Sequence, residues 1–176
     1  MNRKSIYHIT LTAVLAALTT AMILVFFIPV GEGRMHFGDA IILLAAVLLP
    51  TPYAMAVGAI GGGMANLLGG AVLWAPATVI IKAAITMSFS AKQDKLITKR
   101  NVFSLFPYAA ITIIGYALYQ LLLITFGVGQ FAGLVWTVIF ANVLSDLVQI
   151  AGSSVLFILL ATLLEKIKFK QRLGLS

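Results

Sequence analysis

Residues 135–165, VWTVIFANVLSDLVQIAGSSVLFILLATLLE, decide the fold class of this chain. The stretch is long enough to cross a bilayer, whose hydrocarbon core needs about 20 apolar residues in a helix. At about 100° of rotation per residue, its polar side chains fall on one stripe, which consists of Asn142, Ser145, Asp146, Gln149 and Ser153. We therefore predict an apolar helix whose polar stripe faces a cavity or other polar groups, because lipid cannot satisfy it.

The rest of the chain has the composition of a membrane protein. Of its 176 residues, 61% are hydrophobic and 10% are charged, whereas a soluble domain has about 25% charged residues. These values exclude a soluble globule, a disordered chain, collagen and a coiled coil. The absence of Cys excludes disulfide scaffolds, thiolate metal sites and Cys nucleophiles. The net charge of +7 is therefore interpreted against a membrane and not as a sign of nucleic-acid binding.

Hydropathy predicts one domain over residues 1–176, an all-α integral membrane protein built as a compact bundle of six transmembrane helices. The predicted spans are about 6–30, 39–49, 53–68, 74–91, 105–127 and 135–165. The second and third spans could form one broken hairpin, but Pro50 and Pro52 favour a turn between them. Ten of the twelve Lys and Arg residues then fall on one side, Arg34 lies on the other, and Lys82 lies within a span. By the positive-inside rule, both termini are predicted to be cytoplasmic.

Further polar residues lie at membrane depth in the fourth and fifth spans. One face of the fourth span has Thr78, Lys82 and Thr86, and Lys82 lies about 12 Å from either end at helical rise. It could contact a ligand, or pair with Asp39 or Asp146 and so join helices. One side of the fifth span has Tyr108, Thr112, Tyr116 and Tyr119, with Gln120 at the edge.

The first outer loop, residues 31–39, is the one charged outer segment and leads directly into the short second span. Its glycines permit a backbone that folds over a site. His36 in this loop is either interfacial or a ligand contact. Phe37 and Trp74 could stack on a flat ring or anchor the chain at the interface. Asn66, in the third span, could donate a hydrogen bond to a neighbouring helix or contact a ligand.

Small residues recur at four-residue spacing in two spans. Ala13, Ala17 and Ala21 form a smooth stripe along the first span, and Gly58 and Gly62 form one along the third. Such stripes let another helix approach closely in lipid, more often within the same chain than between chains. The nearly continuous alanine stripe makes a separate partner the favoured interpretation for the first span.

Motifs of catalysis are absent from the sequence. It has no G-x-x-x-x-G-K-[ST], no H-E-x-x-H and no G-x-S-x-G. Its two histidines lie near opposite surfaces, so no metal site is predicted either. We therefore expect no enzyme, but a small bundle with an outward-facing polar pocket and no energy source of its own.

These residues together resemble the substrate-binding S components of energy-coupling factor (ECF) vitamin transporters over essentially the whole chain. The resemblance is carried by the six short spans, the alanine stripe, a Gly-rich third span with Asn66, and the segments His36-Phe37-Gly38-Asp39 and Ala75-Pro76-Ala77-Thr78 with Lys82. These segments are similar to those of a subgroup associated with hydroxymethylpyrimidine, a thiamin precursor, or pyridoxine.

The resemblance implies a high-affinity substrate-binding subunit of an ATP-driven importer in the plasma membrane of a prokaryote. A membrane T component would dock on Ala13, Ala17 and Ala21, and two ABC-type ATPase subunits would bind the ATP, so that this chain needs no cofactor. On this hypothesis the vitamin binds on the extracellular side, at residues His36, Asp39, Trp74, Thr78, Lys82, Tyr116, Tyr119, Asn142, Asp146 and Gln149.

A second hypothesis is a stand-alone secondary transporter or channel for a small polar solute, in which Asp146 and Lys82 form a relay. Secondary transporters usually contain inverted repeats and broken midplane helices, and the sequence shows no internal repeat. Transport by this chain alone would favour this second hypothesis.

Overall fold

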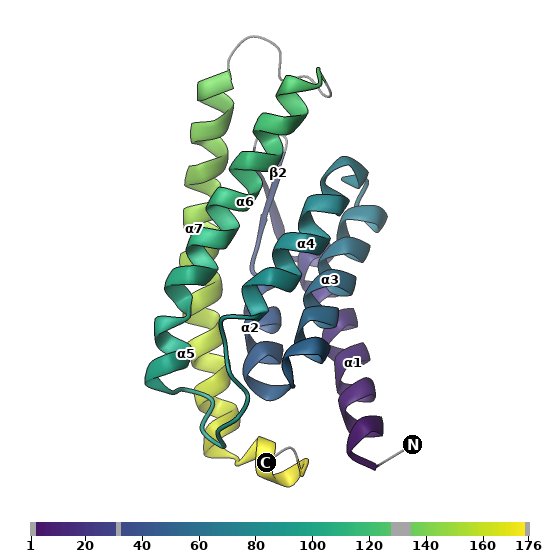
Figure 1. Ribbon diagram of the computed structural model, residues 1–176, viewed down its shortest axis with the longest axis vertical. Helices are drawn as coiled ribbons and strands as arrows, with labels where there is room; N and C mark the ends of the chain where they lie inside the picture. Colours follow the sequence, from purple (N-terminus) through teal and green to yellow (C-terminus); the bar gives the residue numbers. More distant parts are fainter. Residues whose placement is uncertain (1–2, 31–32, 128–134, 175–176) are drawn as a thin grey trace.

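The computed structural model describes residues 3–30, 33–127 and 135–174. Its elements in chain order are α1 (Arg3–Val25), β1 (Phe27–Val30), β2 (Gly33–His36), α2 (Asp39–Leu48), α3 (Thr51–Leu68), the 3₁₀ helix η1 (Val72–Trp74), α4 (Ala75–Thr86), α5 (Lys99–Phe103), α6 (Leu105–Thr125), α7 (Val135–Lys166) and α8 (Phe169–Arg172). The helices form an elongated bundle, and the N- and C-terminal ends of the chain lie together at one end of it (Figure 1). We call this the terminal end and the other the distal end.

Each of the six predicted spans overlaps a helix of the structure, namely α1, α2, α3, α4, α6 or α7. Among the described residues, the stretches Ser5–Val25, Lys99–Thr125 and Asn142–Lys166 are long and apolar enough to cross a membrane. Asp39–Leu48 and Val72–Thr86 are shorter apolar helices. The fold is therefore that of a helical membrane protein, while the number of crossings and the cytoplasmic position of the termini stay predictions.

The first helix is shorter than predicted. It ends at Val25 and not near Val30, and the chain continues as β1, which pairs with β2 in an antiparallel two-stranded sheet. Pro29 explains the difference, because proline has no N–H for a helix and favours an extended residue before it. The predicted end of the first span near Val30 is therefore wrong, and a short hairpin stands within an otherwise helical fold. Gly31 and Glu32 of the predicted loop lie outside the described residues.

The fourth helix also ends before the predicted boundary, at Thr86 and not near Ala91. The residues that follow form a loop that the C-terminal end of the chain holds in place. The Oε2 atom of Glu165 accepts hydrogen bonds from the N–H groups of Leu96 and Ile97, both at 3.1 Å. Hydropathy overestimated this span because the apolar residues of the loop pack in the core, as the 2% exposed Phe89 does, and do not extend the helix.

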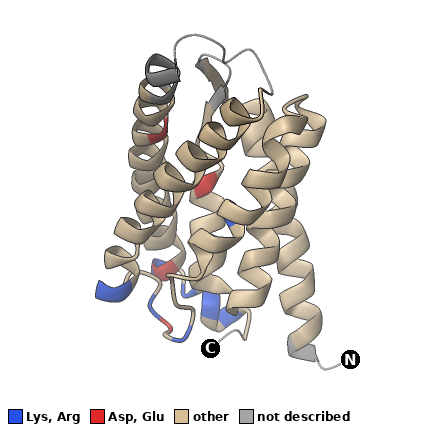
Figure 2. Cartoon of the chain, turned by 45° about the horizontal axis from the view of Figure 1, so that its top comes forward, with Lys and Arg blue, Asp and Glu red and all other residues tan. Residues whose placement is uncertain are grey.

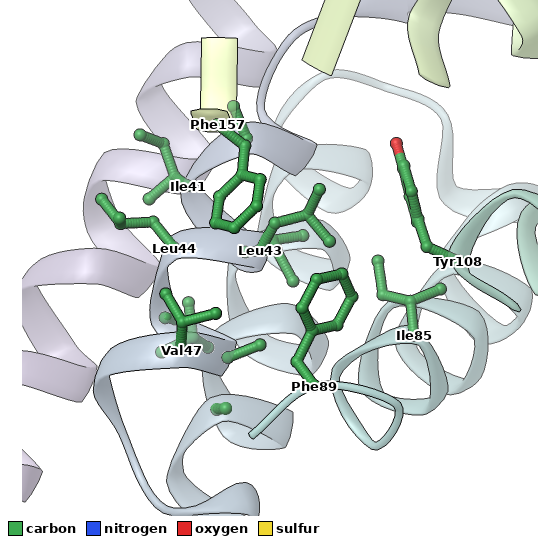
Figure 3. Packing of buried hydrophobic residues seen from close by; sticks show 14 of the residues in the cluster. Ile41, Leu43, Leu44, Val47, Ile85, Phe89, Tyr108 and Phe157 are labelled. Carbon is green, nitrogen blue, oxygen red and sulfur yellow. The ribbon is translucent and has the colours of Figure 1, made fainter. Parts of the chain in front are cut away.

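Helix α2 is the centre of the core. All its residues from Asp39 to Leu48 are buried, as expected of a helix that is hydrophobic on every side. It contacts α1, α3, α4 and α7, and its side chains pack against Ile85, Phe89, Tyr108 and Phe157 (Figure 3). The helix ends where the sequence predicts a turn, because Leu49 is extended before Pro50.

Basic residues gather at the terminal end of the bundle (Figure 2). One of them, Lys170 in α8, is 3% exposed. Its Nζ donates hydrogen bonds to the carbonyl oxygens of Ala91 and Gln93, the latter at 2.6 Å. The charge asymmetry predicted from the sequence is thus present in the structure, although this lysine holds a loop and does not face solvent.

Helices α3 and α4 approach closely because Gly58 has no side chain. A Cβ atom built on Gly58 would overlap the carbonyl oxygen of Lys82, which belongs to the α4 backbone. We expect Gly58→Ala to lower the free energy of unfolding by about 1–3 kcal/mol, because the added methyl group forces two helix backbones apart. Thermal unfolding of the purified protein measures this loss.

Gly63→Ala is the matched control for that substitution. The new Cβ would meet only the Cγ2 methyl of Val79, at 2.8 Å, and Val79 is 38% exposed and has room to move. We expect this variant to be as stable as the wild type or more stable, because alanine favours a helix over glycine. Equal losses in the two variants would contradict the argument from backbone contact.

Candidate functional site

A cavity of about 100 Å³ opens between the helices in the distal half of the bundle. This volume is several times the roughly 10–15 Å³ that one water molecule needs. The cavity is lined by α1, β2, α3, the segment before α4, α4, α6 and α7, through residues Ile23, His36, Gly62, Ala65, Asn66, Ala71, Trp74, Thr78, Tyr116, Ala117, Gln120, Asn142, Val143, Ser145, Asp146 and Gln149. A concave site with an apolar wall and a few convergent polar groups is typical of small-molecule binding.

Seven of the residues predicted to bind substrate line this cavity: His36, Trp74, Thr78, Tyr116, Asn142, Asp146 and Gln149. The structure brings them together from β2, η1, α4, α6 and α7. The polar stripe predicted on residues 135–165 forms the α7 wall through Asn142, Ser145, Asp146 and Gln149, whereas Ser153 is fully buried farther along the helix.

Asp39 and Lys82 lie outside the cavity lining and are engaged with each other. The Nζ of Lys82 donates to Oδ2 of Asp39 at 2.7 Å, and both side chains are at most 1% exposed. The same Oδ2 accepts hydrogen bonds from the hydroxyl of Tyr108 at 3.0 Å and from Nε2 of Gln149 at 3.2 Å. Of the partners left open by the sequence, Asp39 is the one that pairs with Lys82. The sequence predicted that both residues contact a ligand, but the geometry does not favour such a contact.

Gln149 connects the ion pair to the cavity and to the hairpin. Its Nε2 donates to Asp39, while its Oε1 accepts a hydrogen bond from the backbone N–H of His36 at 3.2 Å. Both ends of the carboxamide are therefore occupied, and the side chain is 5% exposed. This contact joins β2 to α7 beside the cavity.

Thr78 is the centre of a second group of polar residues on the cavity wall. Its Oγ1 accepts hydrogen bonds from Nδ2 of Asn66 at 2.6 Å and from the hydroxyl of Tyr116 at 3.1 Å. Asn66 thus joins α3 to α4, as one interpretation of the sequence predicted, and it also lines the cavity. The amino group of Lys82 lies 5.4 Å from the centre of the Tyr116 ring, within the range of a cation–π interaction.

An aromatic wall borders the cavity near the start of α4. The ring of Trp74 lies 6.2 Å from that of Tyr116 and 5.9 Å from that of Tyr119, measured between centroids. The Tyr119 hydroxyl donates to the carbonyl oxygen of Leu73 at 2.6 Å. Tyr119, predicted to contact substrate, therefore supports Trp74 from outside the cavity lining.

Asp146 differs from Asp39 in that it has no hydrogen bond or ion pair with any residue in the described part of the chain, although it lines the cavity. A half-buried carboxylate without a partner is free to accept a hydrogen bond from a ligand. Among the described residues that line the cavity, Asp146 is the one with a carboxyl group.

Gln120 is a cavity residue that the sequence placed only at the edge of the polar side of 105–127. It lies on α6 and is 1% exposed, and its Nε2 has no hydrogen-bond partner within the described ranges. The sequence could have indicated this residue, because Gln120 lies directly before a run of aliphatic residues in a membrane span. A glutamine at such a position is energetically unfavourable unless its side chain faces a cavity or another polar group.

His36 presents a neutral imidazole to the cavity. It lies on β2, outside the helices, and burial lowers its pKa from 6.5 to about 4, which outweighs the opposing effect of Asp39. Its Nδ1 is shielded from solvent and has no partner among the described residues. At neutral pH this ring can donate from one nitrogen and accept at the other.

The lowered pKa of His36 predicts a pH dependence of stability. As pH falls from 6.5 to about 4, the unfolded chain takes up a proton before the folded chain does, so folding weakens across this window. In His36→Gln this contribution is absent, and we expect the melting temperature to fall less between pH 7 and pH 4.5 than in the wild type. Identical pH profiles for the two proteins would show that burial does not disfavour the charged imidazole.

Comparison with known proteins identifies the protein family of this chain. A family model described as "ECF-type riboflavin transporter, S component" matches residues 3–166. That range includes every residue that lines the cavity. A comparison with curated proteins finds no match.

Proposed function

The chain belongs to the family of ECF-type riboflavin transporter S components, and on this premise we propose that its distal cavity captures a small heteroaromatic vitamin or vitamin precursor on the extracellular side. The chain is then the high-affinity substrate-binding subunit of an ATP-driven importer. The observation that carries the proposal is the cavity itself, in which polar groups of α7 face an aromatic wall and Asp146 has no hydrogen bond or ion pair with another described residue.

The chemistry of the lining defines how a flat ring would bind. Trp74 and Tyr116 offer apolar contact to its face. Asp146 and Asn142 offer hydrogen bonds to a ring nitrogen, a hydroxyl or an amine at its edge. Gln149 and Thr78 also line the cavity, but the protein already uses their polar atoms, so they would mainly shape the site.

Hydroxymethylpyrimidine and pyridoxine are the substrates that we favour. Each has a single six-membered ring with several polar substituents, which suits a cavity of about 100 Å³ with polar groups on several sides. Riboflavin, which the family description names, is the alternative. It is larger, with three fused rings and a ribityl chain, and would need the cavity to widen or part of the ligand to extend beyond it.

Titration calorimetry of the purified chain with these three compounds tests the proposal. We expect saturable binding of one molecule per chain in the absence of any other subunit. Mass spectrometry of small molecules that purify with the protein identifies the ligand independently. Transport by the chain alone in proteoliposomes, without ATPases, would contradict the assignment and favour a secondary transporter.

The same proposal assigns a docking role to the alanine stripe of α1. Ala13, Ala17 and Ala21 are exposed, whereas Leu15, Ala16 and Thr19 on the other side of the helix are buried in the bundle. A stripe of small side chains lets a partner helix approach closely in lipid. The partners would be the T component, which docks here, and two ABC-type ATPase subunits, which bind and hydrolyse ATP.

Ala17→Leu should therefore block docking and leave ligand affinity unchanged. The larger side chain projects from the exposed stripe and prevents close approach of the partner helix, and Ala17 is not among the residues that line the distal cavity. Co-purification with the T component and ATPases measures docking, and calorimetry measures affinity. Ala110→Leu, at an exposed alanine of α6, is the control. Intact co-purification of the Ala17 variant would refute this docking face.

A further inference from the structure

Gln120 is an exception among the buried polar residues of the cavity. It is 1% exposed, it lines the cavity from α6, and its Nε2 is shielded from solvent and has no hydrogen-bond partner among the residues that the structure describes. No hydrogen bond joins any part of its carboxamide to another residue in the described ranges. Buried polar groups of folded proteins nearly always have partners, so such a group requires an explanation.

Gln149 provides the comparison within the same cavity. Its carboxamide has the same chemistry, but Nε2 donates to Asp39 and Oε1 accepts from the N–H of His36. One glutamine is thus part of the protein's own network, and the other is not. An unpartnered amide destabilises the folded chain, because it has lost its hydrogen bonds to water without gaining others. The described part of the chain supplies no such partner for Gln120, so its carboxamide is available to a group from outside the chain.

We propose that Gln120 determines specificity, by pairing with a ligand edge on which a hydrogen-bond acceptor lies next to a donor. This inference rests on the proposed function, since it concerns the ligand of the same cavity. A carboxamide presents an N–H donor and a carbonyl acceptor in one plane. It can therefore form two parallel hydrogen bonds with such an edge, as glutamine and asparagine do with the N6 and N7 atoms of adenine.

This geometry narrows the substrate class. An aminopyrimidine has the required edge, because its amino group lies beside a ring nitrogen, and hydroxymethylpyrimidine is of this kind. A lactam also has it, with N–H beside C=O, and the flavin ring system contains one. Pyridoxine has neither group. The inference therefore favours an aminopyrimidine or a lactam over pyridoxine. Two further groups without a partner in the described part of the chain, Nδ1 of His36 and the Asp146 carboxylate, remain for the other substituents.

Stability of the ligand-free protein is the first test, and it needs no knowledge of the ligand. Gln120→Leu replaces the unpartnered amide by an apolar group of similar size. We expect its melting temperature to equal that of the wild type or to rise by up to about 4 °C. Gln149→Leu is the matched control and should melt several degrees lower, because it removes one of the three hydrogen bonds to Asp39 and leaves the N–H of His36 without its acceptor. A Gln120 variant that loses as much stability as the Gln149 variant would overturn the proposal.

Ligand discrimination is the second test. The probes are hydroxymethylpyrimidine and its analogue with hydrogen in place of the amino group, or riboflavin and N3-methylriboflavin if the flavin binds. The wild type should bind the complete compound at least tenfold more tightly than the analogue, a difference of about 1.4 kcal/mol. In Gln120→Leu the affinity for the complete compound should fall at least tenfold, and most of the discrimination should disappear.

The outcomes separate this inference from the proposed function. Binding of hydroxymethylpyrimidine or riboflavin with equal affinity in the wild type and in Gln120→Leu would leave the function standing and overturn the role of Gln120, as would a preference for pyridoxine. No binding of any of the three compounds would instead count against the proposed substrates. The melting temperatures would still decide whether Gln120 lacks a protein partner.

Discussion

Lys82→Met should lower the free energy of unfolding by about 3–5 kcal/mol, the usual cost of removing one partner of a buried ion pair. Asp39 is 0% exposed, and the substitution leaves its carboxylate in the interior without a counter-charge. The hydroxyl of Tyr108 and Nε2 of Gln149 would still donate to it, but neither carries a positive charge. Thermal or denaturant unfolding in detergent measures the loss.

Two comparisons determine whether the unpaired charge causes this loss. Lys82→Met combined with Asp39→Leu removes both charges, and we expect it to recover much of the stability, since an apolar pair often replaces a buried ion pair at little cost. Lys99→Met, at an exposed lysine of α5, should change stability by no more than about 0.5 kcal/mol. A double variant less stable than the single one would contradict this explanation.

Asp146→Ala should weaken binding of the captured ligand at least tenfold. A hydrogen bond to a charged group contributes about 1.5–3 kcal/mol, and each 1.4 kcal/mol corresponds to a factor of ten in affinity. Because Asp146 has no hydrogen bond or ion pair with another described residue, its removal should leave the folded protein almost as stable as before. Calorimetric titration gives the affinity and thermal unfolding gives the stability.

Asp94→Ala is the control for that experiment. Asp94 is an exposed carboxylate in the loop between α4 and α5, where its Oδ2 accepts a hydrogen bond from Gln171 at 3.3 Å. It is distant in the fold from the cavity, so its removal should leave affinity unchanged. Wild-type affinity in Asp146→Ala would exclude this carboxylate from the site.

Features that depend on local periodicity could be predicted from the sequence. The polar residues of α7 repeat at helical spacing, and Asn142, Asp146 and Gln149 indeed line one cavity. The break between α2 and α3 follows from Pro50, which acts on its immediate neighbours. The exposed alanine stripe of α1 is likewise a property of one helix face. In each case the pattern lies within a single segment.

Features that depend on contacts between distant segments could not be predicted. Periodicity gave no means to choose between Asp39 and Asp146 as the partner of Lys82, because the choice depends on how α2, α4 and α7 pack. The unpartnered state of Gln120 is a property of all its neighbours and has no local pattern. The β-hairpin was not predicted because residues 26–30 are as apolar as a membrane helix. In this stretch, only Pro29 indicates that the first helix has ended.

The most direct test of ligand capture is an experimental structure of the protein with hydroxymethylpyrimidine or riboflavin, whichever binds in the titrations. We predict that the ring lies inside the distal cavity, beside Trp74, with hydrogen bonds to Asp146 and Gln120. A structure in which Asn142, Asp146 and Gln120 bond to one another in a closed interior, with the ligand elsewhere, would contradict it.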